Sequence, residues 1–313
     1  MAQLRVVSTR AQISPTRFWN EYEWGDLKAD PAKLVERYFD AHLYFANWGA
    51  HRLMLRAPIA RVDAKGLRSY FIGHAATARI AGEYLILDLH SDDEEADDYE
   101  EGEGSLAALA PLRTELMRGD LRVAYLAWLL AVQSGDVSEK SLEPEVPRML
   151  SELTAPQKAM VAFLRIDEDL ISAAADGGEL LRAFHAKAKP APRLGGRRTV
   201  AQLLAAAETH RGQRERAATA RTEKAKKAAE AARTKRLDAL ARRLDEAWAK
   251  LEVLVAKSAY EEAIKLAIDL RDLGKRAGAS ASFSARFEAM RKRQLRRRGF
   301  FDRWKYENEP QRW

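Results

Sequence analysis

The 313-residue chain is 47% hydrophobic and 32% charged with a formal net charge of +7, so it can bury at least one core and exposes a long charged surface. It contains no cysteine, which excludes disulfides, thiolate zinc sites, iron–sulfur clusters and cysteine nucleophiles. No stretch approaches roughly 18 uninterrupted apolar residues, and the first ten residues lack the apolar core of a secretion signal, so we expect a cytoplasmic protein that does not cross a membrane.

The first predicted helix begins at Asp30 and Pro31, an N-cap residue followed by a first-turn proline. Apolar and aromatic residues then recur at helical spacing from Leu34 to Trp48, and Gly49 is expected to end the helix. We expect the aromatic side chains of this region to form a core rather than to stack on nucleic-acid bases. They are Phe18, Trp19, Tyr22, Trp24, Tyr38, Phe39, Tyr44, Phe45 and Trp48.

Three runs of strand character follow, at 52–56, 69–72 and 83–89, and glycine or proline separates them. They predict a short antiparallel sheet with helices packed on one face. We therefore expect residues 1–188 to form an acidic α+β globular domain. Its further helices are predicted at 106–117, 120–133, 154–165, 169–175 and 179–187.

An acidic loop is predicted at 88–103, where ten carboxylates occur without a lysine or arginine. Three interpretations stay open: a solvated loop, a phosphate mimic that docks onto the basic part of the same chain, and a metal site. The calcium loop of an EF-hand does not fit, because Tyr99 stands where that pattern needs an oxygen ligand.

Residues 189–198 read as a linker, because prolines followed by paired glycines do not continue a helix. The charge changes sign near this point. From Ala186 onward there are 33 Lys and Arg against 16 Asp and Glu, whereas the preceding residues hold 20 against 30. This asymmetry predicts a polyanion partner for the second half, or attraction between the halves.

Beyond the linker, 199–257 has the composition of a nearly unbroken helix, and its part at 199–236 is strongly basic. From residue 237 apolar positions recur in steps of three and four, which is typical of a helix that pairs with another helix. We expect 237–313 to form a helical hairpin or three-helix bundle with a basic end. The leucines of the predicted pairing seam are Leu237, Leu240, Leu244, Leu251 and Leu254.

The whole chain is thus predicted to be mainly α with a small α+β N-terminal domain. The basic helix and the basic end of the bundle are its candidate polyanion-binding site, because lysines and arginines neutralise phosphates without reading sequence. The alternative is a solvated helix whose charges are paired with interspersed carboxylates. The candidate residues are Arg211, Arg214, Arg216, Arg221, Lys224, Lys226, Lys227, Arg233, Lys235, Arg236, Arg291, Lys292, Arg293, Arg296, Arg297 and Arg298.

No catalytic residue, cofactor or metal site is predicted. The glycine-rich phosphate loop, the dinucleotide-binding pattern and the nucleophile elbow do not occur, and the six histidines show no zinc-protease spacing. His90, between Asp88 and Asp92, is the one imidazole that local sequence places beside carboxylates. We expect it to be an ordinary residue at the end of a strand.

Several long motifs resemble a family of uncharacterised bacterial proteins: PTRFWNEYEWGDLK at 15–28, ERYFDA at 36–41, ANWG at 46–49, YEEAI at 260–264 and DLRDL at 269–273. Members of that family generally begin with an additional aromatic and acidic segment and have a longer central region, and both are missing here. The resemblance implies an architecture and no activity. The C-terminal segment is also similar to the ends of some proteins with SWIM-type zinc fingers, but a chain without cysteine does not form that zinc site.

Our first hypothesis is a non-enzymatic binding or scaffold protein. Its basic helical arm would contact nucleic acid or another polyanion non-specifically, and its N-terminal domain would contact a protein partner. The second is an assembly factor without nucleic-acid binding, which pairs or self-associates through 237–254. The third is an enzyme with a site in the α+β domain.

Overall fold

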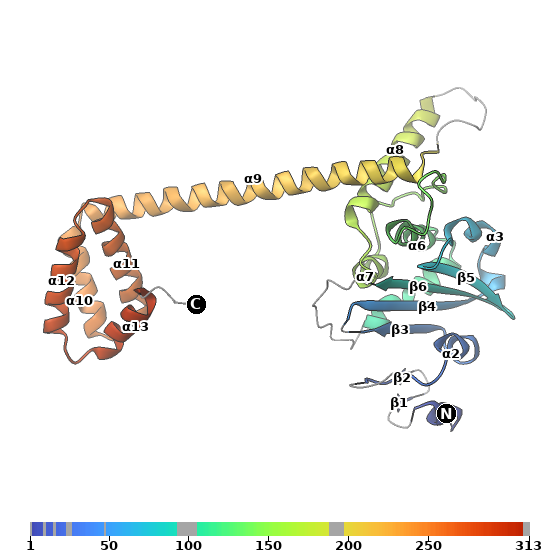
Figure 1. The fold of residues 1–313 in the computed structure, drawn as a ribbon, viewed down its shortest axis with the longest axis horizontal. Helices are drawn as coiled ribbons and strands as arrows, with labels where there is room; N and C mark the ends of the chain where they lie inside the picture. The colour runs from blue at the N-terminus through green and yellow to red at the C-terminus, as the bar shows by residue number, and fades with distance from the viewer. Residues whose placement is uncertain are drawn as a thin grey trace. The chain divides into compact units, whose positions relative to one another are not determined.

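A computed structural model describes residues 2–8, 11–14, 17–22, 27–46, 48–92, 105–187 and 197–308. The chain divides into two compact units, Met1–Glu215 and Arg216–Trp313. The described residues confirm the predicted class, mainly α with a small α+β N-terminal part (Figure 1). We expected the boundary at the linker 189–198, whereas the two units divide inside a helix further along the chain.

The first unit is built on a four-stranded antiparallel sheet with the strand order β3-β4-β6-β5. Leu53 of β4 lies opposite Leu89 of β6, and both point into the main core of the unit. The other face of the sheet is covered by α2 (Pro31–Arg37), whose Val35 packs on Met54 and Ile86. The strands are β3 (Ala41–Phe45), β4 (Ala50–Pro58), β5 (Ala76–Ala81) and β6 (Tyr84–Asp92).

Short elements complete this part of the chain. A two-stranded ladder joins β1 and β2, and a helical turn precedes it. Asp63 caps the next helix by accepting a hydrogen bond from the backbone of Gly66. These elements are α1 (Ala2–Val7), β1 (Gln12–Ile13), β2 (Phe18–Trp19), η1 (Ile59–Arg61), α3 (Ala64–Leu67) and η2 (Arg68–Tyr70).

The structure corrects the predicted first helix, which ends at Arg37 instead of Gly49. Residues 41–45 form strand β3, because apolar residues at Leu43 and Phe45 fit a period of two as well as a helical period, and pairing with β4 satisfies their backbone. Gly49, with a φ of 90°, lies in the hairpin turn between β3 and β4.

The aromatic residues of this region are not the predicted core. None of those that the structure describes is buried, and the side chains of Tyr22, Tyr38 and Trp48 are exposed. Phe45 is the one that packs against the main core. Phe18 and Trp19 lie on the short strand β2, and Tyr44 and Phe45 lie on the edge strand β3 of the four-stranded sheet.

Two further strand assignments change. Residues 69–72 do not form a strand: the chain stays helical through Tyr70, whose hydroxyl donates to the carbonyl of Glu145. The edge strand β5, which lies beyond Gly73, was not predicted. The first residues of the predicted acidic loop, 88–92, continue β6, and its residues 93–103 lie outside the described residues.

Three helices of the first unit, α4, α5 and α6, pack against the sheet, and every residue of α6 from Val123 to Val132 is buried. Trp128 is buried in this core. The predicted helices 169–175 and 179–187 are one helix, α8, because Gly177 and Gly178 lie within a helical turn. The helices are α4 (Ser105–Leu109), α5 (Pro111–Met117), α6 (Arg122–Gln133), α7 (Ala155–Phe163) and α8 (Glu168–Lys187).

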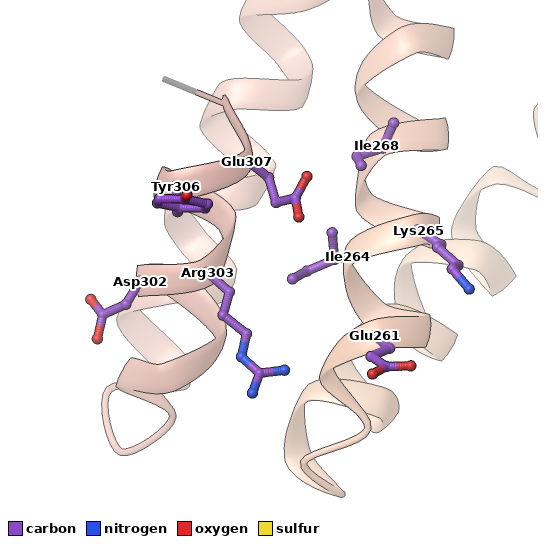
Figure 2. Close-up of a pocket in the computed structure, with 8 residues that line it drawn as sticks. All are labelled: Glu261, Ile264, Lys265, Ile268, Asp302, Arg303, Tyr306 and Glu307. Carbon is purple, nitrogen blue, oxygen red and sulfur yellow. The ribbon is translucent and has the colours of Figure 1, made fainter. Parts of the chain in front are cut away.

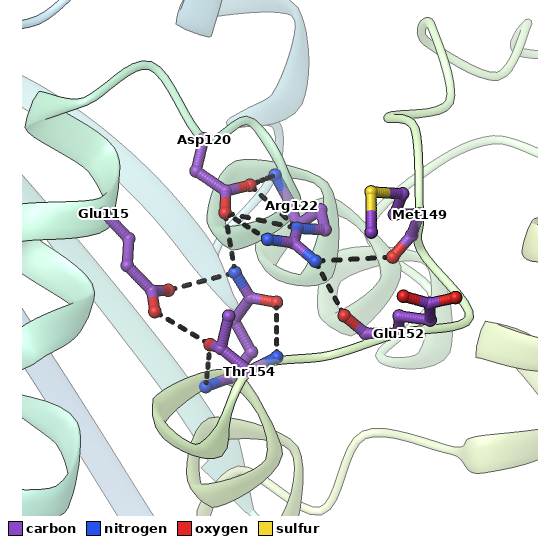
Figure 3. Close-up of polar contacts among 7 residues, drawn as sticks. Glu115, Asp120, Arg122, Met149, Glu152 and Thr154 are labelled. Carbon is purple, nitrogen blue, oxygen red and sulfur yellow. Dashed lines mark hydrogen bonds and ion pairs between the residues drawn. The ribbon is translucent and has the colours of Figure 1, made fainter.

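A polar cluster joins α5, α6 and α7 (Figure 3). Gln157, which is fully buried, donates to Glu115 at 2.9 Å and to Asp120 at 3.0 Å. Thr154 caps α7 and donates to Glu115 at 2.8 Å. Burial opposes ionisation of Asp120, but hydrogen bonds from Arg122 outweigh it and lower its pKa. The cluster fixes the three helices to one another.

The long basic helix is α9 (Val200–Ala241). Its first turns belong to the first unit, since Val200, Leu203 and Ala207 are buried in the main core. The buried carboxylate of Glu143 binds the start of this helix: Arg198 donates to it at 2.5 and 2.9 Å. The hydroxyl of Tyr125 donates to the same carboxylate.

The second unit is a helical bundle with a core of its own, centred on Trp248, Leu251 and Phe300. Four helices follow α9 among its described residues, where we expected a helical hairpin or a three-helix bundle. The chain leaves helical geometry at Arg243, so 199–257 is not one helix, and the interruption lets α10 pack on α11. The helices are α10 (Leu244–Ala256), α11 (Tyr260–Arg276), α12 (Ser280–Arg293) and α13 (Arg298–Asn308).

Candidate nucleic-acid interface

Residues 213–236, the central part of α9, are all exposed to solvent. The apolar side chains in this stretch are all alanines. Alanine, arginine, lysine and glutamate favour helix strongly, so the sequence forms a helix here without a core to bury. Between 216 and 236 there are eight Lys and Arg against Glu223 and Glu230.

The first two candidate cations are already paired within the first unit. Arg211 donates to Asp167 at 2.6 Å, and Arg214 donates to Asp169 at 2.6 Å. The hydrogen bond to Asp167 raises the pKa of Arg211. Asp169 is buried at the beginning of α8. Both arginines therefore neutralise carboxylates of the same molecule.

Two cations near the end of α9 are paired in the same way within the second unit. Arg233 forms an ion pair with Asp272, and Arg236 forms one with Asp269. Both carboxylates come from α11, and their side chains are mostly buried. These arginines attach the last turns of α9 to the bundle.

Five candidate cations remain between these pairs without a carboxylate partner among the described residues. They are exposed, and all belong to the second unit. Lys226 differs from them, because its Nζ lies 3.4 Å from Glu223. We call the five residues the free cationic face: Arg216, Arg221, Lys224, Lys227 and Lys235.

The helical repeat places the free cationic face on one side of α9. At about 100° per residue, its five cations fall within an arc of about 140°, and Glu223 and Glu230 lie outside that arc. The paired residues Arg233 and Arg236 also lie outside it. With a rise of 1.5 Å per residue, the face extends for about 28 Å from Arg216 to Lys235.

A second, smaller cationic group lies where α12 is followed by α13. Three of its members have partners: Arg291 pairs with Glu288, Arg293 with Glu252, and Arg297 donates to the hydroxyl of Ser258. The other three are exposed and have no carboxylate partner in the described part of the chain. They are Lys292, Arg296 and Arg298.

The predicted pairing seam faces the bundle of its own unit. Leu237 and Leu251 are buried, and Leu240 and Leu254 pack against the bundle core. Leu244 is the exception, with 40% of its surface exposed. The apolar spacing at 237–254 is therefore used mainly within this molecule.

The structure also brings together the imidazole and carboxylate that the sequence placed near each other. His90 lies 2.9 Å from Asp88, which accepts two further hydrogen bonds from Arg52. Burial opposes ionisation of Asp88, but the bonds from Arg52 and His90 outweigh it and hold its pKa well below the usual range. The carboxylate is thus occupied, and Asp92 has no part in the cluster.

Other features of the described residues do not make a site. No group of His, Asp or Glu among them has the arrangement of a metal centre, and none of their helices has the length and apolar character needed to cross a membrane. A groove of about 640 Å³ lies between α11 and α13 (Figure 2), and its wall mixes Lys265 and Arg303 with Glu261 and Glu307.

Sequence reasoning missed the four aspartates that pair with arginines of α9. The only signal was their spacing, since Asp167 and Asp169 stand two residues apart and Asp269 and Asp272 one helical turn apart.

Comparison of the chain with models of protein families, with curated proteins and with solved structures finds no match. The resemblance to a bacterial family stays a prediction.

Proposed function

We propose that this protein is a non-enzymatic binding protein whose helix α9 holds nucleic acid by contacts to phosphates, without sequence specificity. The observation that carries the proposal is the free cationic face. Its five cations are exposed and have no carboxylate partner among the described residues, so they can neutralise phosphates and release the counterions condensed on a nucleic acid. Cations that are already paired with carboxylates contribute less to this release.

The charge pattern disfavours a helix that serves only as a solvated spacer. Arg221, Lys224 and Lys227 follow one another at intervals of three residues, and like charges at this spacing destabilise a helix by about 0.2–0.5 kcal/mol per pair. A spacer would be more stable with carboxylates at these positions. Bound phosphates would relieve the repulsion, which accounts for its presence.

A membrane surface is a poorer partner for the same face. Amphipathic helices that bind bilayers insert large apolar side chains between the lipids. The positions between the cations of α9 are occupied by Ala217, Ala220, Ala228 and Ala231, which offer little apolar surface. The face therefore suits a polyanion that is bound by charge alone.

The first unit is proposed to contact a protein partner. Its exposed aromatic side chains support this part of the proposal, since Tyr and Trp are enriched at the centres of protein interfaces. Trp48 is 64% exposed and Tyr38 is 42% exposed.

Assembly through 237–254 is the second candidate function, and the exposed Leu244 is the observation in its favour.

The test is binding of the full chain to a labelled nucleic acid at increasing salt, with a variant in which the five cations of the free cationic face are glutamine. We expect binding at low salt that weakens as salt rises, and its loss in the variant. The control variant carries the same charge change on exposed residues of the first unit: Lys65, Arg68, Arg118, Lys140 and Lys158 are replaced by glutamine.

Absence of binding at low salt would refute the proposal, as would equal binding by the two variants. Sedimentation of the same samples checks the second candidate. A stable oligomer that has no affinity for nucleic acid, and that dissociates when Leu244 is replaced by Asp, would favour the assembly factor.

A further inference from the structure

The free cationic face lacks the side chains that single-stranded nucleic acids need. Proteins that hold single strands place aromatic rings under successive bases. No Phe, Trp or Tyr occurs anywhere in α9. Each of its five cations is separated from the next by alanines and other small or polar residues, so a base that approached this helix would find no ring on which to stack.

Among the described residues of the second unit, the aromatic rings of the bundle core and of the groove do not supply such a platform. Trp248, Phe287 and Phe300 are buried in the bundle core. Tyr306, which is exposed, lies in the groove between α11 and α13 (Figure 2). Asp302 and Glu307 stand beside it there and would repel a phosphate backbone.

The geometry of the face suits a duplex instead. Its cations are spaced along one helix over about 28 Å, and B-form DNA presents one negative charge per about 1.7 Å of its axis in a fixed array. A single strand would have to lose conformational freedom to match the same array. The duplex is already ordered, so it binds without that cost.

The alanines of the face add a steric argument. An α-helix with its side chains is about 10–12 Å wide, and the major groove of B-form DNA is about 12 Å wide. Small side chains at Ala217, Ala220, Ala228 and Ala231 let the helix backbone lie close to the phosphates at the edge of such a groove, while the long cations reach them.

We infer that the partner of α9 is double-stranded nucleic acid, bound through the phosphates of the duplex by Arg216, Arg221, Lys224, Lys227 and Lys235. This inference rests on the proposed function and narrows it to one class of nucleic acid. The bases are not read, because phosphate contacts carry no sequence information and the face offers no asparagine or glutamine to a base edge.

The experiment compares the full chain on a 30-base-pair DNA duplex, on each of its separated strands and on an oligothymidine of equal length. We expect the duplex to bind about tenfold more tightly or better at moderate salt. With five phosphate contacts, the logarithm of its binding constant should fall against the logarithm of salt with a slope of about −4 to −5. Replacement of Lys224 by Gln should reduce that slope by about 1.

Two aromatic variants, Ala217→Trp and Ala228→Trp, test the reason for the preference. Each places a ring among the cations, so it should raise the affinity for oligothymidine several-fold and leave that for the duplex nearly unchanged. Circular dichroism checks that α9 is retained. An equal gain on duplex and single strand would contradict the stacking argument.

The outcomes separate the two proposals. Equal or tighter binding of single strands overturns the duplex inference and leaves the proposed function standing. Binding to neither nucleic acid overturns the proposed function itself. A third arm uses anionic phospholipid vesicles at the same salt, and vesicle binding that equals duplex binding would also overturn the choice of a duplex.

Discussion

Arg236 donates a hydrogen bond of 2.6 Å to Oδ1 of Asp269, a carboxylate on α11 whose side chain is 10% exposed. The preceding residue, Lys235, belongs to the free cationic face and has no carboxylate partner among the described residues. Two adjacent basic residues of one helix thus differ in their contacts. Arg236 is paired with a carboxylate of the bundle, and Lys235 is exposed to solvent.

We expect Arg236→Ala to lower the free energy of unfolding of the second unit by about 1–3 kcal/mol, because Asp269 loses its partner in a mostly buried position. Lys235→Ala should change it by less than about 0.5 kcal/mol. Urea unfolding of the full chain measures both. The affinity for the duplex should change in the opposite order, with the larger loss in Lys235→Ala. An equal loss of affinity in the two variants would contradict this difference between Lys235 and Arg236.

A charge reversal within the free cationic face should lower the affinity for the duplex and raise the stability of the helix. Lys224→Glu places a carboxylate one turn from both Arg221 and Lys227, so the helix should become more stable by a few tenths of a kcal/mol, roughly 0.5. Duplex affinity at low salt should fall, since attraction becomes repulsion. Thermal unfolding and a binding titration measure the two effects.

Lys226→Glu is the matched control for that prediction. It makes the same charge change two residues away, outside the arc of the free cationic face, where Lys226 already pairs with Glu223. Its loss of affinity should be clearly smaller. Equal losses in the two variants would show that net charge, and not the face, governs binding.

Several helices of the fold were predictable because their signals are local. The N-cap at Thr154, the apolar face around Trp128 and the exposed basic helix all follow from residues within a few turns. The edge strand β5 was not predictable, since Ala76–Ala81 has weak alternation and its exposed side chains give no apolar pattern. Its pairing with β6 is a tertiary interaction.

In the candidate site, too, tertiary interactions could not be predicted from local sequence. The positions of the cations on one side of α9 follow from the helical repeat and could be read from sequence. Which of them are free could not, because the carboxylates that pair with Arg211 and Arg236 lie 44 and 33 residues away in the chain. Short-range pairs, such as Lys226 with Glu223 and Arg211 with Glu208, were visible without the structure.

The start of α9 should depend strongly on Glu143. Its carboxylate is buried and accepts hydrogen bonds from Arg198 and Tyr125, so Glu143→Ala leaves a guanidinium unpaired in a buried site and should cost about 3–5 kcal/mol. Tyr125→Phe removes one hydrogen bond and should cost about 1 kcal/mol. Urea unfolding followed by tryptophan fluorescence measures the series.

Glu145→Ala provides the comparison for that series, since Glu145 is exposed and lies two residues from Glu143. It should change the free energy of unfolding by less than about 0.5 kcal/mol. If Glu143→Ala were as mild, the buried pair would not hold the start of α9.

His42 should make the first unit sensitive to mild acid. Burial, reinforced by the charge of Arg52, lowers the pKa of this histidine to about 4 from 6.5, and its Nε2 is buried without a hydrogen-bond partner. The unfolded chain therefore takes up a proton before the folded one does. The contribution of His42 to the free energy of unfolding is therefore fully present above pH about 6.5. It falls by up to about 3 kcal/mol as the pH drops towards 4.

Urea unfolding between pH 7 and 4.5 measures this loss. His42→Leu should flatten the pH dependence of stability, because it removes the titrating group together with its buried and unpaired Nε2. A variant that loses stability with acid as steeply as the original protein would assign the effect to another group.

The exposed middle of α9 also determines how this helix opens. Its amide hydrogen bonds are covered by no packed side chain from 213 to 236, whereas Leu203 before it and Leu237 after it are buried. Fraying normally starts at helix ends, but here both ends are held. Opening must create two new ends inside the helix, a costly nucleation step, so deuterium should enter its centre by short internal openings while its flanks stay protected.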